Sequence, residues 1–173
     1  MRQNYEIKTR IKSTDSTRKL AALYFRGKKF LHYTEQQEDI YYKVRKGRLK
    51  LRIVNSSYGT LIFYNRSSRT GKRISDYLLS SVPDPAELRK IFGMLFTELV
   101  RVKKKREIFR TDTIRIHIDS VSGLGKYLEF EVIFNSFKKA VVVMKGLIEH
   151  FGLDEKNFIK CSYSDLLLNK KEK

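Results

Sequence analysis

The sequence predicts a mostly β fold of the α+β class, with eight antiparallel strands and flanking helices. The first observation is a hairpin over residues 114–133, in which apolar and charged residues alternate and Gly123 and Gly125 supply the turn. The second observation is that the same alternation recurs in other segments, separated by helix caps and turn residues. Strands with one ionic face each form either an open sheet with a wet face or a closed barrel with the charges inside.

Alternation with a period of two residues predicts strands over 4–11, 38–44, 47–54, 60–66, 73–79, 100–110, 113–120 and 127–134. Between them, Ser13, Thr14 and Asp15 offer caps for a helix that ends near Gly27, and Asp84 caps a helix that runs through Phe96. Ser136 is expected to cap a third helix that ends at Gly152, and residues 162–168 predict a short turn or helix. The chain shows no repeat of fixed period and no linker, so we expect residues 1–173 to form one domain.

The composition predicts a globular, cytoplasmic protein that attracts polyanions. The chain has 173 residues, of which 41% are hydrophobic, and 37 basic against 19 acidic residues give a net charge of +18. Cys161 is the only cysteine, which excludes an internal disulfide and a thiolate metal cluster. No apolar run is long enough to span a bilayer, so no membrane partner is expected.

If the polar faces of the strands converge, they bring seven basic and four acidic side chains together. These are Lys8, Lys50, Arg52, Arg66, Lys104, Arg106 and Arg115 with Glu6, Asp119, Glu129 and Glu131. A phosphate chain would satisfy basic side chains from several strands, and clustered carboxylates suit Mg²⁺ or Mn²⁺. Glu129 and Glu131 alone would be better explained by a solvated strand face, but Glu6, Lys8 and the basic pairs beside them favour a site.

Two neighbouring features have simpler interpretations. His117 lies on the polar face without a His or Cys partner in sequence, which favours a hydrogen-bonding role over metal ligation. The basic run 103–106 would also suit nucleic acid, but alternation places Lys103 and Lys105 outside when Lys104 and Arg106 are inside. Nucleic acid is therefore a secondary candidate partner.

Several short segments, in order along the chain, resemble the CYTH superfamily, also called triphosphate tunnel metalloenzymes. They are residues 6–8, 47–52, 61–64 with Arg66, 75–77, 104–107, 115–119, 123–125 with 128–131, and 163–167. Within the superfamily the chain is most similar to sequences named class IV adenylyl cyclases. The resemblance implies an eight-stranded antiparallel barrel that forms a tunnel and divalent ions on the glutamates. It implies that a triphosphate is bound by the basic side chains, with Lys8 and Arg115 as catalytic candidates.

The chain departs from the family pattern at two positions. The opening Glu-x-Glu-x-Lys is here Asn4-x-Glu6-x-Lys8, so an amide that carries no charge replaces the first carboxylate. The lysine often found on the fourth strand is absent, and Tyr64 stands at about that position. The first departure bears on how many metal ions the chain binds.

The hypothesis favoured by the resemblance is that the protein is an adenylyl cyclase, which converts ATP to cyclic AMP and pyrophosphate with Mg²⁺ or Mn²⁺. The alternatives are a triphosphatase acting on thiamine triphosphate, tripolyphosphate or a nucleotide, and a non-catalytic binder of polyphosphate or an RNA 5′ end. A cyclase needs a nucleoside pocket, for which the candidates are Tyr41, Tyr64, Phe109 and Tyr163, although core packing explains them equally well. The protein is expected to be a monomer or a homodimer.

Overall fold

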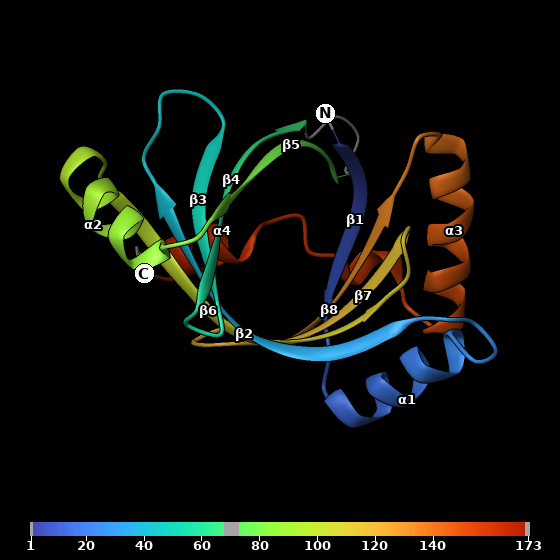
Figure 1. Ribbon diagram of the computed structural model, residues 1–173. Helices are drawn as coiled ribbons and strands as arrows, with labels where there is room; N and C mark the ends of the chain where they lie inside the picture. Colours follow the sequence, from blue (N-terminus) through green and yellow to red (C-terminus); the bar gives the residue numbers. More distant parts are fainter. Residues whose placement is uncertain (1, 68–72, 172–173) are drawn as a thin grey trace.

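The protein folds as a closed barrel of eight antiparallel strands (Figure 1). This computed structural model describes residues 2–67 and 73–171, with side chains over residues 3–65 and 77–170. The strands are β1 (Arg2–Arg10), β2 (Leu31–Tyr42), β3 (Arg48–Val54), β4 (Tyr58–Ser67), β5 (Arg73–Val82), β6 (Glu98–Arg110), β7 (Ile114–Val121) and β8 (Gly125–Ile133). Their order around the barrel is β1-β5-β4-β3-β2-β6-β7-β8, and β1 closes it by pairing with both β5 and β8. The predicted barrel is confirmed, and the open sheet is not found.

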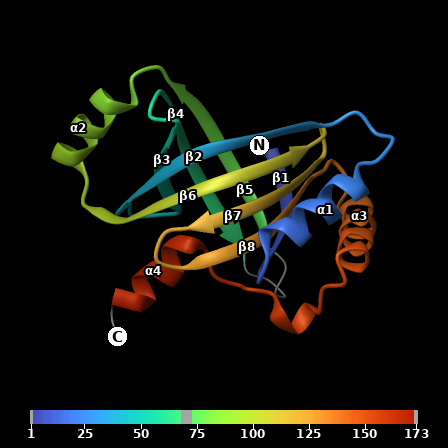
Figure 2. The ribbon, with the colours of Figure 1, turned by 90° about the horizontal axis from the view of Figure 1, so that it is seen from below.

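Helices cover the outside of the barrel at several places. They are α1 (Thr14–Tyr24), α2 (Pro85–Leu95), α3 (Phe137–His150), the 3-10 helix η2 (Glu155–Asn157) and α4 (Tyr163–Lys171). Figures 1 and 2 show α1 and α3 together on one side of the barrel and α2 on the other. Within the described residues, the helices are all too short or too polar to cross a membrane.

The hydrophobic core lies between the barrel and its helices rather than inside the barrel. The outward side chains of Ile7, Ile116 and Phe130 are at most 9% exposed and pack in one cluster with Ala21 of α1 and Met144 of α3. A second cluster joins the outward side chains of β2 and β3 to α2. Because the outward positions are buried in this way, alternation turns the charged positions of the same strands inward.

Helix α4 lies across one end of the barrel (Figure 2). At the start of β6 the inward positions are Val100 and Val102, which are 3% and 1% exposed and pack in one cluster with Tyr127 and Tyr163. Leu166 and its neighbours on α4 pack against the same cluster. The barrel interior is therefore apolar and filled at this end, and the ionic positions lie beyond it.

Local signals set the helix starts in two of three predicted cases. The Ser13 hydroxyl accepts a hydrogen bond from the backbone N–H of Ser16, and Asp84 accepts one from Glu87 at 2.9 Å. Ser136 occupies the predicted cap position of α3, but its side chain makes no capping hydrogen bond. The expectation that its hydroxyl caps the helix is therefore wrong.

The second strand is longer than predicted. It begins at Leu31 rather than at residue 38, and it pairs with β6 from Leu31 opposite Arg110 to Tyr42 opposite Glu98. Its first half has polar residues on both faces, so no alternation marks it, and pairing with β6 imposes the extended conformation. The turn before β4 contains Asn55 and Ser56, both at positive φ.

We expect Gly59→Ala to destabilise the protein by about 1–3 kcal/mol. An added Cβ would lie 2.7 Å from Cβ of Pro85 and 3.2 Å from Cβ of Val82, where β4 meets the start of α2. Gly93→Ala, on α2, is the control, because nothing lies within 4 Å of its added Cβ. Alanine should stabilise that helix by roughly 1 kcal/mol relative to glycine. Urea unfolding of the two variants measures both changes, and equal stability for both would contradict this packing.

Candidate functional site

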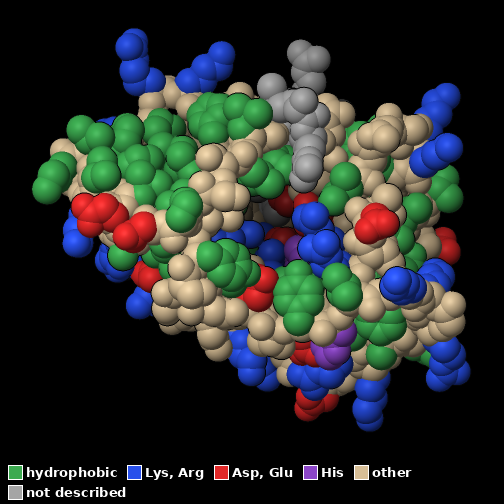
Figure 3. Space-filling view, viewed as in Figure 1, with side chains coloured by type: hydrophobic (Ala, Val, Ile, Leu, Met, Phe, Trp, Pro, Cys, Tyr) green, Lys and Arg blue, Asp and Glu red, His purple; other side chains and the backbone are tan. Residues whose placement is uncertain are grey.

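The barrel encloses a cavity of about 310 Å³ that carries most of the predicted site residues. Figure 3 shows it as a hollow in which basic, acidic and histidine side chains are visible. The charged side chains that line it, among those described, are Lys8, Lys50, Arg52, Lys104, Arg106, Arg110 and Arg115 with Glu6, Glu35, Asp39, Glu129 and Glu131. Seven basic against five acidic side chains leave an excess of two positive charges, one fewer than the sequence predicted.

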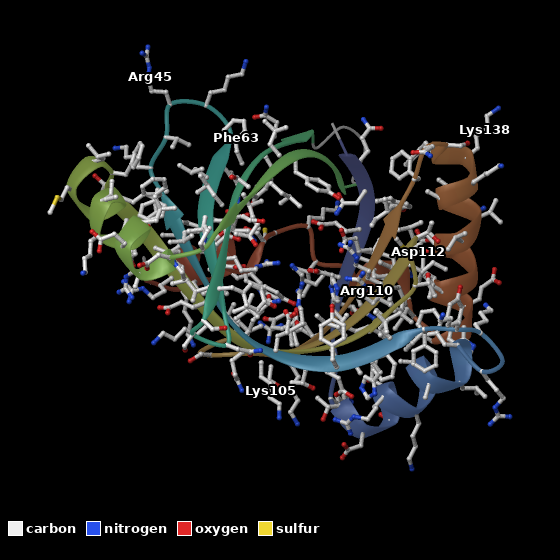
Figure 4. The ribbon with its side chains drawn as sticks, in the orientation of Figure 1. Arg45, Phe63, Lys105, Arg110, Asp112 and Lys138 are labelled. Atoms are coloured by element: carbon white, nitrogen blue, oxygen red, sulfur yellow. The ribbon has the colours of Figure 1, made fainter. Side chains whose placement is uncertain are left out.

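The alternation of β6 is as predicted and continues to Arg110. Lys104 and Arg106 line the cavity, and so does Arg110, which the sequence analysis did not select although it shares their parity. Figure 4 shows Arg110 in the barrel and Lys105 pointing away from it. The basic run is thus divided between the two faces of one strand.

Asp39 organises the basic side chains of β3 and β6. Its carboxylate, 1% exposed, accepts hydrogen bonds from Lys50 Nζ at 2.9 Å, from Arg52 Nε at 2.6 Å and from Lys104 Nζ at 3.0 Å. Burial acts to raise its pKa, but the three cations prevail and hold the pKa well below its usual range. Asp39 was not among the residues predicted from the sequence. It follows the alternation of β2, in which Glu35, Gln37 and Asp39 all line the cavity.

A second ionic network joins β1, β6, β7 and β8. Glu129 is paired with Lys8 Nζ and Arg106 Nη2, each at 3.0 Å, while His117 Nδ1 lies 3.3 Å from it. Burial opposes ionisation of Glu129, but Lys8 and Arg106 hold its pKa well below the usual value. His117 therefore acts as a hydrogen-bonding neighbour in this structure, as the sequence predicted.

Lys104 is a cavity cation whose charged form is disfavoured by burial. Its pKa is lowered to about 7, chiefly by burial and also by Arg106, Arg52 and Lys50, while Asp39 acts to raise it. A phosphate group bound nearby would favour the charged form of Lys104. Binding would then take up a proton at pH values above 7, because the pKa would rise from that value.

Asp119 does not reach the cavity. It is fully buried, its oxygens accept hydrogen bonds from Arg106 Nε at 2.7 Å and from the Tyr163 hydroxyl at 2.7 Å, and it does not line the hollow. Its expected role as a metal ligand stays a prediction, and in this structure its hydrogen bonds tie Arg106 to the helix that closes the barrel. The packing of α4 over β6 and β7 could not be read from the alternation.

The aromatic candidates divide into two groups. Tyr41, Tyr64 and Tyr163 line the cavity. Phe109 faces outward, is 1% exposed and stacks on His32 with ring centroids 4.0 Å apart, so it is a core residue. The side chain of Arg66 lies outside the described residues.

Residues 2–163 match the CYTH domain family. The chain belongs to this family. It is 28% identical over 175 residues to a Methanocaldococcus jannaschii protein named "Putative adenylate cyclase", covering 93% of this chain and 97% of that protein. Its fold is similar to that of the PH1012 protein from Pyrococcus horikoshii, with a TM-score of 0.82, 25% identity and 94% and 98% of the two chains covered. A conserved hypothetical protein from Pyrococcus furiosus gives a TM-score of 0.81 at 25% identity, with 94% and 99% covered.

The donor atoms of the CYTH cavity suit a hard divalent cation at the β1–β8 seam. Glu6 lies opposite Glu131 in the strand register, and both line the cavity. Asn4 donates to Glu131 at 2.7 Å, and its buried Oδ1 atom has no hydrogen-bond partner. An oxygen that accepts no hydrogen bond, beside two carboxylates, is the donor type that Mg²⁺ and Mn²⁺ prefer. Among the described residues, however, no three Asp, Glu, His or Cys side chains converge closely enough to hold a metal.

We expect Asp39→Asn to destabilise the protein by about 3–5 kcal/mol, because the buried cations would lose their shared counter-ion. Glu98→Gln is the control, since Glu98 forms an exposed ion pair with Arg101 at 2.7 Å and such pairs contribute less than about 1 kcal/mol. Chemical denaturation of both variants measures the difference. Equal effects would show that Asp39 does not hold the network together.

Proposed function

We propose that this CYTH protein is a metal-dependent enzyme that acts on a triphosphate, most specifically an adenylyl cyclase that forms cyclic AMP and pyrophosphate from ATP. The observation that supports the proposal is the convergence of seven cations on one cavity. A triphosphate carries roughly four negative charges, more than the cavity excess of two, and one divalent cation would supply the difference.

The proposed phosphate-binding surface is formed by β3, β6 and β7. Lys50, Arg52, Lys104 and Arg106 would grip the chain of phosphates from one side, and Arg110 would meet it at the mouth. Lys8 and Arg115, the two candidates for catalytic roles, approach from β1 and β7. Arg66 remains a further candidate.

The proposed metal ligands are Glu6, Glu129 and Glu131, joined by the Asn4 amide oxygen. The ion would neutralise phosphate charge and polarise a phosphoryl oxygen. Lys8 and Arg115 are paired with Glu129 and Glu131 in this structure, at 3.0 and 3.1 Å. A metal at the carboxylates would release both cations to the phosphates, which couples the two binding events.

Cyclisation requires the ribose 3′ oxygen to attack the α-phosphorus in line with the leaving pyrophosphate. The side chains contribute by holding the phosphates and stabilising the charge that develops on them. Hydrolysis is the second candidate because the hollow opens to solvent (Figure 3), and water would attack the terminal phosphorus in the same cation frame. Binding without turnover is the third, since Asn4 removes one negative charge from the metal site.

Incubation with ATP, thiamine triphosphate and tripolyphosphate in Mg²⁺ or Mn²⁺, followed by separation of the products, tests the proposal. We expect cyclic AMP and pyrophosphate from ATP. Arg115→Ala is the control for contaminating activity, because the product should then be lost. Faster cleavage of tripolyphosphate without cyclic AMP would establish the triphosphatase, and binding without any product would establish the binder.

We expect Glu131→Gln to weaken Mn²⁺ binding by at least about tenfold, because it removes a proposed ligand, and Asn4→Glu to strengthen it. Calorimetric titration with Mn²⁺ measures the affinity independently of turnover. Glu35→Gln is the matched control, a carboxylate that lines the same cavity from β2 and bonds to Gln37 rather than to the proposed metal group. Equal weakening by Glu35→Gln would contradict the assignment.

A further inference from the structure

One wall of the cavity differs from the rest. The residues of β4 and β5 that line it, among those described, are uncharged: Ile62, Tyr64, Tyr77 and Leu79. In the strand register Ile62 lies opposite Leu79 and Tyr64 lies opposite Tyr77, so the four side chains form a compact two-by-two patch. We call it the apolar wall.

The apolar wall is partly open to solvent. Leu79 is 51% exposed, and Ile62 and Tyr77 are partly exposed, whereas Tyr64 is 7% exposed. Figure 3 shows hydrophobic side chains bordering the hollow in which the charged ones lie. Apolar surface in contact with water is unfavourable by about 25 cal/mol per Å², so covering this wall would stabilise a complex.

Phosphates do not suit this wall, because it offers few donors and would strip them of water. A flat aromatic ring does suit it, since bases stack on tyrosine faces and pack on aliphatic side chains. The wall also begins beside the cations: Ile62 lies opposite Lys50 in the register of β3 and β4. A ring carried by a phosphate chain bound at Lys50 would therefore reach it.

We propose that the apolar wall binds an aromatic heterocycle attached to the triphosphate, so that the protein selects organic triphosphates over tripolyphosphate. This rests on the proposed function, because it needs the phosphates in the basic part of the cavity. Nucleobases and the rings of thiamine share the required chemistry. Tyr64 lines this wall with an aromatic ring rather than a cation, so the wall suits a ring better than another phosphate.

The test compares Leu79→Ser and Ile62→Ser with Leu78→Ser. Leu78 is the matched control because it is the next residue on β5, is 56% exposed and does not line the cavity. Calorimetry in Mg²⁺ gives the affinities of α,β-methylene-ATP, thiamine triphosphate and tripolyphosphate for each protein.

We expect the wild-type protein to prefer at least one organic triphosphate over tripolyphosphate by about 5- to 100-fold, the range of stacking one base. Leu79→Ser and Ile62→Ser should lose most of that preference with unchanged tripolyphosphate affinity, and Leu78→Ser should retain it. Whichever heterocycle is preferred, this pattern supports the proposal. Equal affinity for all three ligands, or equal weakening by Leu78→Ser, would overturn the proposal that the apolar wall binds a heterocycle. The proposed triphosphate site would not be affected by that result. Failure of all three to bind would overturn both.

Discussion

The pairing of each buried cation with a carboxylate is the constraint on which this structure depends. An ion moved from water into a protein interior loses several kcal/mol of solvation, and only well-placed opposite charges compensate. Asp39 does this for the cations of β3 and β6, and Glu129 does it for Lys8 and Arg106. The barrel can therefore fold without ligand, because these buried basic side chains already have partners.

The same constraint sets the exchange that a ligand must perform. A phosphate that reaches Lys50 or Lys104 competes with Asp39, whose carboxylate is held in place by Arg52 through two hydrogen bonds. The cations are held in position before binding, which lowers the entropy lost when they grip a ligand. The cost is a smaller net charge, which explains why a divalent cation suits this cavity.

The strand alternation predicted most of the inward side chains because the period of two residues is a local property of the chain. It placed Lys50, Arg52 and Glu131 correctly for this reason. It failed at β2, where both faces are polar and the register with β6 decides the orientation of Asp39. It placed Asp119 on the inward face, but did not predict its burial beside the Tyr163 hydroxyl of α4, 44 residues along the chain. The proposed roles of these residues remain predictions, since they depend on ligands.

The closure of one end of the barrel by α4 affects how a ligand would enter and leave the cavity. Among the described residues, Val100, Val102 and Tyr163 pack together where β6 begins, so side chains fill this end of the barrel. Under the proposed function, substrate and product would then both pass through the opposite end of the barrel. A product with two phosphates would have to leave past the same cations that bind the substrate. Product release, rather than bond formation, would then limit the rate of turnover.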